Sequence, residues 1–274
     1  MLKKLENMSN QDVIDAVETN IRELSTVWGH AIHAKFSAEP EATWYVSGVP
    51  FITHNWVTQT QFTANTSQSK IDEILNRINA HQVPFLWIVD SSSSSDFLNH
   101  IKEHGWQGGP TAIQVRDIET LDEENICSEE VTVELVNNSE TMKQWTRAFV
   151  SGYGGVPEVV FEHTVELLHT YGFVQHSATR YYLGRLNGEP VTSTLLFLGG
   201  GVAGIYNVAT LPHARRHGIA RSVTLAALQG ARDMGYHTVT LQATNMGLSV
   251  YQHLGFKEQG AINFYILPGK PEHS

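Results

Sequence analysis

The sequence has very little cysteine and no long apolar run. Its 274 residues include one cysteine, Cys127, so no disulfide can form within the chain, and a reducing compartment is expected. Cys127 stands in an acidic stretch without a nearby histidine, which disfavours a catalytic thiol. The most apolar segments, residues 84–89 and 195–205, are shorter than the roughly 18 residues that a membrane helix needs. No apolar run follows Lys3 and Lys4, so a signal peptide is not expected.

Basic residues are also scarce. The chain has 18 Lys and Arg against 28 Asp and Glu, which gives a net charge of −10. Proteins that bind nucleic acid normally carry a basic surface, so a nucleic-acid partner is not expected. With 41% hydrophobic residues the chain can bury a core without disulfides. These features predict a soluble cytoplasmic protein without membrane association, present as a monomer or a homodimer.

Acidic residues crowd together between residues 117 and 130 without any apolar period. Such a stretch is typical of a connector, and it predicts two domains, residues 1–125 and 130–274.

The first half alternates helical and strand patterns. The helices are expected at residues 5–24, 69–79 and 97–104, with Ser9 or Asn10 capping the first, the serine run 91–95 forming a loop and cap before the last, and Gly105 ending it. Strands are expected at residues 43–46, 51–58 and 84–90.

The second half predicts the order β-α-α-β-β-β-α-β-α-β. Its strands are expected at residues 131–136, 178–186, 191–198, 204–210, 237–241 and 261–267, and its helices at residues 141–150, 158–171, 218–234 and 247–254. Asn187-Gly188 predicts a hairpin, because both residues accept a positive φ. This order indicates an α/β fold of mixed α+β type, in which a mostly antiparallel sheet has helices on both faces.

A basic turn joins the strand at 204–210 to the following helix. Its core is Arg215-x-x-Gly218-x-Ala220. Free N–H groups and a partial positive charge at a helix N-terminus favour an anion, and Gly218 permits close approach to the backbone. Alone, the pattern fits an ordinary strand-to-helix turn equally well. No Gly-Lys-Ser/Thr or Gly-x-Gly-x-x-Gly motif is present, which disfavours P-loop and dinucleotide-binding proteins.

A second segment, residues 241–256, contains Asn245, Tyr251 and Gly255-Phe256. Together with the basic turn it resembles motifs A and B of the GCN5-related N-acetyltransferase (GNAT) superfamily, which carries an R/Q-x-x-G-x-G/A loop. The resemblance is specific across residues 204–258 and extends by element order to about residue 130. The first half resembles the degenerate N-terminal GNAT-like half of tandem members. Because it lacks the loop, it is not expected to bind CoA.

The resemblance implies transfer of an acetyl group from acetyl-CoA to a primary amine of a small molecule, an acyltransferase reaction of EC 2.3.1 type. In the family, two splayed strands admit the pantetheine arm, and the loop holds the pyrophosphate. The implied cofactor contacts are Val208, Ala209, Thr210, Arg215, Arg216, His217, Gly218, Ile219, Ala220, Arg221 and Asn245. Tyr251 matches the tyrosine that protonates the leaving thiolate, and a phenol with a pKa near ~10 can do so at neutral pH. A packed core aromatic is the alternative for Tyr251.

The general base and the acceptor site are less defined. Candidate bases by position are Glu158, Glu162, His163, His176, Tyr206 and Asn207, and none has a spacing that distinguishes it. Four aromatic residues can line an acceptor pocket or, as is commoner at helical spacing, form core: Trp145, Phe149, Tyr153 and Phe161. The loop 152–155 is expected to contact the acceptor.

Histidine pairs at helical spacing raise the question of a metal. The pairs are His30 and His33, His100 and His104, and His213 and His217. None lies in a His-Glu-x-x-His frame, so surface or capping roles are expected and a metal is not. Two alternatives to a small-molecule acetyltransferase stay open, a catalytically silent CoA-binding sensor or scaffold and an acetyltransferase acting on a protein or peptide N-terminus.

Overall fold

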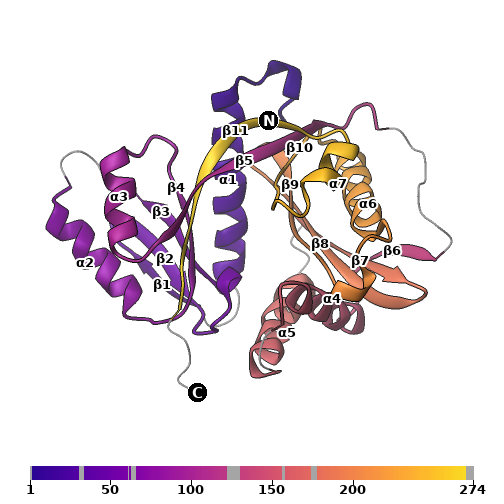
Figure 1. Ribbon diagram of the computed structural model, residues 1–274, viewed down its shortest axis with the longest axis horizontal. Helices are drawn as coiled ribbons and strands as arrows, with labels where there is room; N and C mark the ends of the chain where they lie inside the picture. Colours follow the sequence, from indigo (N-terminus) through magenta and orange to yellow (C-terminus); the bar gives the residue numbers. More distant parts are fainter. Residues whose placement is uncertain are drawn as a thin grey trace. The chain divides into compact units, whose positions relative to one another are not determined.

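The computed structural model describes residues 2–30, 34–60, 62, 66–121, 130–155, 158–173 and 178–269. Cys127 and His176 lie outside the described residues, as do most of the acidic residues of the predicted connector. The chain forms two compact units (Figure 1): unit 1 contains Met1–Glu23 and Ala112–Gly260, and unit 2 contains Leu24–Thr111 and Ala261–Ser274. No helix of the described chain is long and apolar enough to cross a membrane.

This division differs from the predicted sequential one, residues 1–125 and 130–274. The N-terminal 23 residues lie with the second half of the chain, and the last strand lies with the first half. Three elements, α1, β5 and β11, therefore cross the division along their length. A change in composition along the chain can reveal a connector between two consecutive segments. It does not reveal that a terminal element packs against a distant part of the chain.

Unit 1 is built on a sheet with the strand order β5-β10-β9-β8-β7-β6. The strands are β5 (Gln107–Asp117), β6 (Val131–Leu135), β7 (Thr179–Leu186), β8 (Glu189–Gly199), β9 (Val202–Thr210) and β10 (Thr238–Gln242). β9 and β10 are parallel, and the other neighbouring pairs are antiparallel. The helices are η1 (Leu5–Asn7), α1 (Asn10–Gly29), α4 (Ser139–Gly152), α5 (Glu158–Phe173), η3 (Pro212–Ala214), α6 (Ile219–Asp233) and α7 (Leu248–His253).

Helices cover both faces of this sheet, as the element order predicts. Successive residues of a strand point to opposite faces. On β7, Tyr181 packs its ring against Trp145 of α4 at 5.0 Å, whereas a Cβ added at Gly230 of α6 would lie 2.0 Å from the hydroxyl of Tyr182. Helices α4 and α6 therefore lie on opposite faces of the sheet (Figure 1). The predicted hairpin between β7 and β8 is confirmed, with Asn187 at φ 50° and Gly188 at φ 84°.

Helix α1 joins unit 1 through a buried amide. Asn20 is completely buried, and its Nδ2 donates to the carbonyls of Gly199 at 2.8 Å and Val202 at 3.1 Å. Its Oδ1 accepts the hydroxyl proton of Tyr206 at 2.5 Å. A Cβ at Gly204 would lie 2.4 Å from this Oδ1, so the missing side chain makes the approach possible. The predicted cap is confirmed, because Ser9 Oγ accepts from the Asp12 amide at 3.2 Å.

Unit 2 has the strand order β1-β2-β3-β4-β11. Its elements are β1 (Lys35–Ala38), β2 (Ala42–Val46), η2 (Ile52–His54), β3 (Asn55–Thr60), α2 (Gln68–Asn79), β4 (Phe85–Val89), α3 (Ser95–Glu103) and β11 (Lys257–Leu267). β3 and β4 are parallel, and the other neighbouring pairs are antiparallel. Its core contains Trp44, Trp87 and Trp106, packed with the buried face of α2, which consists of Ile71, Ile74, Leu75 and Ile78. Ser94 caps α3 within the predicted serine run.

Some elements of the first half differ from prediction. The strand expected from residue 51 begins only at Asn55, because Ile52–His54 form a 3-10 turn. β1 and β5 were not predicted. β1 is short and mostly exposed, so it has no apolar period to reveal it, and β5 includes Pro110 and two glycines, which normally disfavour a strand.

We expect Asn20→Ala to destabilise the protein by about 2–4 kcal/mol, because it leaves the Tyr206 hydroxyl and two buried carbonyls without their partner. Urea unfolding monitored by circular dichroism measures the loss. Gln11→Ala, at an exposed position of the same helix, is the control and should change stability by less than about 0.5 kcal/mol. Equal unfolding midpoints for the two variants would contradict the role given to Asn20.

Burial of His54 predicts acid sensitivity. Its ring is enclosed with Trp28 and Phe51, and burial lowers its pKa from 6.5 to about 3. Between these values the unfolded chain binds a proton that the folded chain excludes, so stability is lost as the pH falls below 6.5, by at most about 1.4 kcal/mol per pH unit. Urea titrations at about pH 7 and about pH 5 should show a smaller acid loss for His54→Phe than for the wild type. An identical loss would rule out His54 as a source.

Candidate functional site

The site begins where two parallel strands of unit 1 separate. β9 and β10 pair only at Ala203–Val239 and Gly204–Thr240, although β9 continues to Thr210. On its other edge β9 keeps pairing with β8 as far as Thr192–Thr210. Backbone groups alternate between the two edges of a strand. The end of β9, which includes the predicted residues Val208, Ala209 and Thr210, therefore turns part of its hydrogen-bonding groups toward the gap left by β10.

A β-bulge lies on β9 within this opening. Ser193 pairs with Ala209 and Leu195 with Tyr206, so Asn207 and Val208 face only one residue of β8. Asn207 has a φ of 53°, and its carbonyl accepts from Ser193 Oγ at 2.8 Å. Its Nδ2 is buried without a partner among the described residues. A strained residue with an unpaired buried donor is typical of a binding site.

The loop after β9 has features expected of an anion site. Arg216 and Gly218 have φ values of 69° and 77°, left-handed conformations of the kind that occur in anion-binding turns. No side chain caps α6, and its first turn contains no acidic residue. A Cβ at Gly218 would meet no atom within 4 Å, so the space in front of the helix is open. The first turn, Ile219, Ala220 and Arg221, thus offers its N–H groups to a ligand.

The basic residues of this loop have different environments. Arg215 donates from Nε to the Thr210 carbonyl at 3.1 Å and from one terminal nitrogen to the Gly152 carbonyl at 3.4 Å. It therefore fastens the loop to the end of β9 and to the end of α4, and direct contact between Arg215 and an anion stays a prediction. Arg216 and His217 are exposed. Arg221 has a buried Nε without a partner in the described chain.

Tyr251 lies on α7, the helix after β10. Its side chain is 8% exposed, and its ring meets the Phe256 ring edge-on at 5.9 Å. Burial raises the pKa of the Tyr251 phenol well above its usual value, and the neighbouring Tyr153 adds to the effect. The residue is thus both a packed aromatic and a phenol that keeps its proton at neutral pH. Asn245 is exposed in the turn before α7, and its contact with a cofactor stays a prediction.

No candidate base is distinguished by the structure. Glu158 is exposed and pairs with Arg147 at 3.3 Å, and Glu162 and His163 are also exposed. His176 lies outside the described residues. Tyr206 is unsuited to the role, because its hydroxyl donates to Asn20 and burial raises its pKa. The Asn207 amide has no basic atom, but its free N–H can donate to a carbonyl oxygen.

The aromatic residues of α4 and α5 separate into two groups. Trp145, Phe149 and Phe161 are buried, which confirms the core interpretation for these three. Tyr153 is 52% exposed and is followed by Gly154 and Gly155, both with positive φ. Trp145 also donates from Nε1 to the Thr194 carbonyl opposite the bulge, at 3.1 Å. Sequence reasoning missed Ser193 and Asn20, since polar residues on buried elements give no periodic signal.

Residues 141–256 match the model described as the acetyltransferase (GNAT) family. N-acetyltransferase 8B of Homo sapiens is 44% identical over 55 residues, which are 19% of this chain and 24% of that protein. The aligned stretch thus spans about a quarter of this relative.

Solved structures resemble the chain over most of its length, and two of them illustrate the likeness. One is a GCN5-related N-acetyltransferase from Kribbella flavida, with a TM-score of 0.59 and 14% identity over 90% of this chain and 95% of that one. The other is a tandem GNAT protein from the clavulanic acid biosynthesis pathway, with a TM-score of 0.58 and 10% identity over 97% of this chain and 96% of that one. The predicted tandem GNAT-like fold is confirmed.

Proposed function

We propose that the protein is an acetyl-CoA-dependent N-acetyltransferase acting on a primary amine of a small molecule, starting from the match of residues 141–256 to the acetyltransferase (GNAT) family model. The observation that carries the proposal is the uncapped N-terminus of α6, placed directly after the strand that separates from its neighbour. An anion site alone fits many ligands. The site lies beside the edge of β9 that β10 leaves unpaired. This position favours a ligand that is anionic at one end and carries an arm with amide groups, which can pair with the strand.

In this proposal the loop 216–221 binds the pyrophosphate of CoA. The N–H groups of Gly218, Ile219 and Ala220 donate to the phosphate oxygens, and the positive end of the α6 dipole adds to the attraction. Arg221 supplies a guanidinium whose Nε has no protein partner in the described chain. Arg215 acts indirectly, by holding the loop against Thr210.

The pantetheine arm lies along the exposed edge of β9. Its amides exchange hydrogen bonds with the backbone of Val208, Ala209 and Thr210, as an added strand would. The thioester then lies near the bulge, where the Asn207 amide N–H can donate to the acetyl oxygen. That donor supports the negative charge that develops on the oxygen during the reaction.

The reaction is a direct transfer. The neutral amine attacks the thioester carbonyl carbon, and the resulting tetrahedral intermediate breaks its C–S bond to give the N-acetyl product. The leaving thiolate takes the proton of the Tyr251 hydroxyl, and the proton lost by the amine passes to water or an exposed base. Burial of Tyr251 supports its role as a donor, because the raised pKa keeps the phenol protonated.

The acceptor is placed near Tyr153 and the glycines that follow it. Tyr153 is the exposed aromatic at the end of α4, and residues 154 and 155 have the positive φ values of a loop that only glycine adopts freely. An acceptor held there can contact the Tyr153 ring as the loop changes conformation.

Calorimetry with acetyl-CoA tests the cofactor site. We expect Gly218→Glu to weaken binding at least about 100-fold, because it places a carboxylate among the phosphate-binding N–H groups. Gly188→Glu is the matched control, since Gly188 also has a φ near 80° with no atom within 4 Å of an added Cβ. The control should keep the wild-type affinity. Equal affinity in both variants would exclude a pyrophosphate at this loop.

A kinetic experiment tests the enzyme against the silent sensor. We expect Tyr251→Phe to lower kcat by about 100-fold with the KM for acetyl-CoA nearly unchanged, since it removes only the proton donor. Because its pKa is raised, the wild-type phenol should not limit kcat by deprotonation up to about pH 10. Release of CoA thiol against panels of small amines and of peptides is the assay. Acetyl-CoA binding without transfer to either panel favours the sensor, and transfer to peptides alone favours an N-terminal acetyltransferase.

A further inference from the structure

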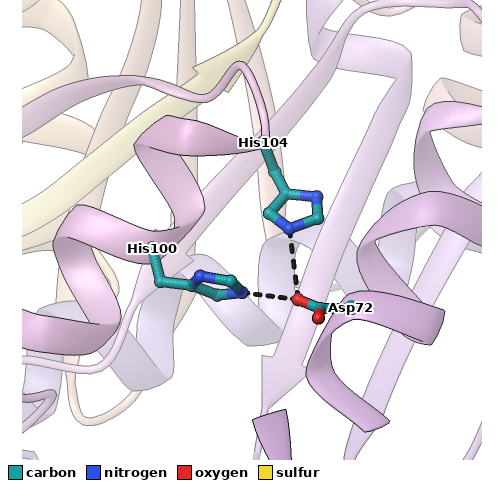
Figure 2. Close-up of side chains that lie close together, drawn as sticks. All are labelled: Asp72, His100 and His104. Atoms are coloured by element: carbon teal, nitrogen blue, oxygen red, sulfur yellow. Dashed lines mark hydrogen bonds and ion pairs between the residues drawn. The ribbon is translucent and has the colours of Figure 1, made fainter. Parts of the chain in front are cut away.

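Three side chains converge on the surface of unit 2, far along the chain from the proposed acetyl-transfer site. Figure 2 shows Asp72 of α2 pointing toward His100 and His104, which lie at the end of α3. Asp72 Oδ1 is 2.7 Å from Nε2 of His100 and 3.2 Å from Nε2 of His104. The two imidazole rings are 4.8 Å apart between centroids and inclined by 65°. One atom from each residue thus faces a common point.

We propose that Asp72, His100 and His104 form a binding site for a divalent transition-metal ion, with zinc as the best fit. Imidazole nitrogens together with one carboxylate oxygen suit zinc, whereas magnesium and calcium prefer oxygen ligands alone. The three ligand atoms all lie within 4.8 Å of one another. A tetrahedral zinc with bonds of about 2.0–2.1 Å places neighbouring ligand atoms about 3.3 Å apart. Only small side-chain rotations separate the observed distances from that arrangement.

The backbone already holds the three ligands in place. His100 and His104 are four residues apart, so both project from the same side of the helix. Ser94 Oγ accepts from the Phe97 amide at 3.2 Å and fixes the start of α3. At the other end, Asn79 of α2 donates from Nδ2 to the His104 carbonyl at 3.2 Å, which ties the ends of the two helices together. A metal ion would therefore bind without reordering either helix.

A neighbouring carboxylate can support the tautomer that a bound metal needs. Glu103 Oε2 lies 3.6 Å from Nδ1 of His100. A proton on Nδ1 of His100 is stabilised by this charge, and it leaves Nε2 with a free lone pair directed at the site. Without a metal, each Nε2 can instead donate its proton to Asp72 Oδ1. Metal binding thus replaces two hydrogen bonds by coordinate bonds.

Solvent can reach the site and complete the coordination. The side chains of His100, His104 and Asp72 are 17%, 20% and 39% exposed. Three protein ligands leave at least one position for water. We assign the ion a structural role, in which it fastens α2 to α3. The sequence pairs His100 with His104, but only the fold brings Asp72, 28 positions before His100, to the same point.

Zinc titration of the full chain, prepared without a histidine tag, tests the site. We expect one equivalent of Zn²⁺ to remain bound after dialysis, to be measurable by metal analysis and calorimetry, and to raise the thermal unfolding midpoint where Mg²⁺ does not. Asp72→Asn keeps a hydrogen-bond acceptor for the histidines but removes the charge, and we expect it to weaken Zn²⁺ binding at least about tenfold. His100→Gln should do the same.

Controls separate this site from the other histidines and from acetyl transfer. His81→Gln removes an exposed histidine of unit 2 and should leave Zn²⁺ binding unchanged. Zn²⁺ should leave the affinity for acetyl-CoA unchanged, because the two ligands bind at different residues. The zinc test therefore remains valid even if the proposed enzyme function is wrong. No stoichiometric Zn²⁺ binding by the wild type, or equal binding by the wild type, Asp72→Asn and His100→Gln, would overturn the proposal and leave a hydrogen-bonded cluster only.

Discussion

The proposed site depends on the separation of β9 from β10. Their parallel pairing ends at Gly204 and Thr240, and β9 continues for six residues with β8 as its only strand partner in the described chain. If β10 had continued alongside, the edge of β9 would be satisfied and no ligand could add to it. Separation leaves backbone donors and acceptors beside the uncapped start of α6. Because unpaired backbone groups are costly to bury, this opening is stable only as a place for solvent or a ligand.

Several polar contacts hold the separated strand in its position. Ser193 donates to the Asn207 carbonyl in the bulge, and Trp145 donates to the Thr194 carbonyl on the strand opposite it. Arg215 donates to the carbonyl of Thr210. On the opposite end of β9, Asn20 binds the β8–β9 hairpin and Tyr206. Apart from the local bond between Arg215 and Thr210, these bonds link residues distant in sequence. The positioning of β9 is therefore a property of unit 1 as a whole, which includes the N-terminal part of α1.

The two units carry different chemistry. Unit 1 has an uncapped helix N-terminus and a buried phenol, whereas in unit 2 the carboxylate of Asp72 pairs with His100 and His104. The proposed metal would stabilise one unit through two helices, and the proposed cofactor would stabilise the other by binding along β9. Stabilisation by each proposed ligand would therefore be a separate measure of the unit that binds it.

The sequence by itself determined the local features of this protein. Apolar periods predicted most helices and strands, Asn187-Gly188 predicted its hairpin, and the spacing from Arg215 to Ala220 predicted an open, uncapped helix start. Each depends on residues close together in the chain. Tertiary structure alone decided that α1 docks on β9, that Arg215 reaches the Gly152 carbonyl, and that Asp72 meets His100 and His104. Those outcomes depend on contacts between distant residues, which local pattern and propensity do not encode.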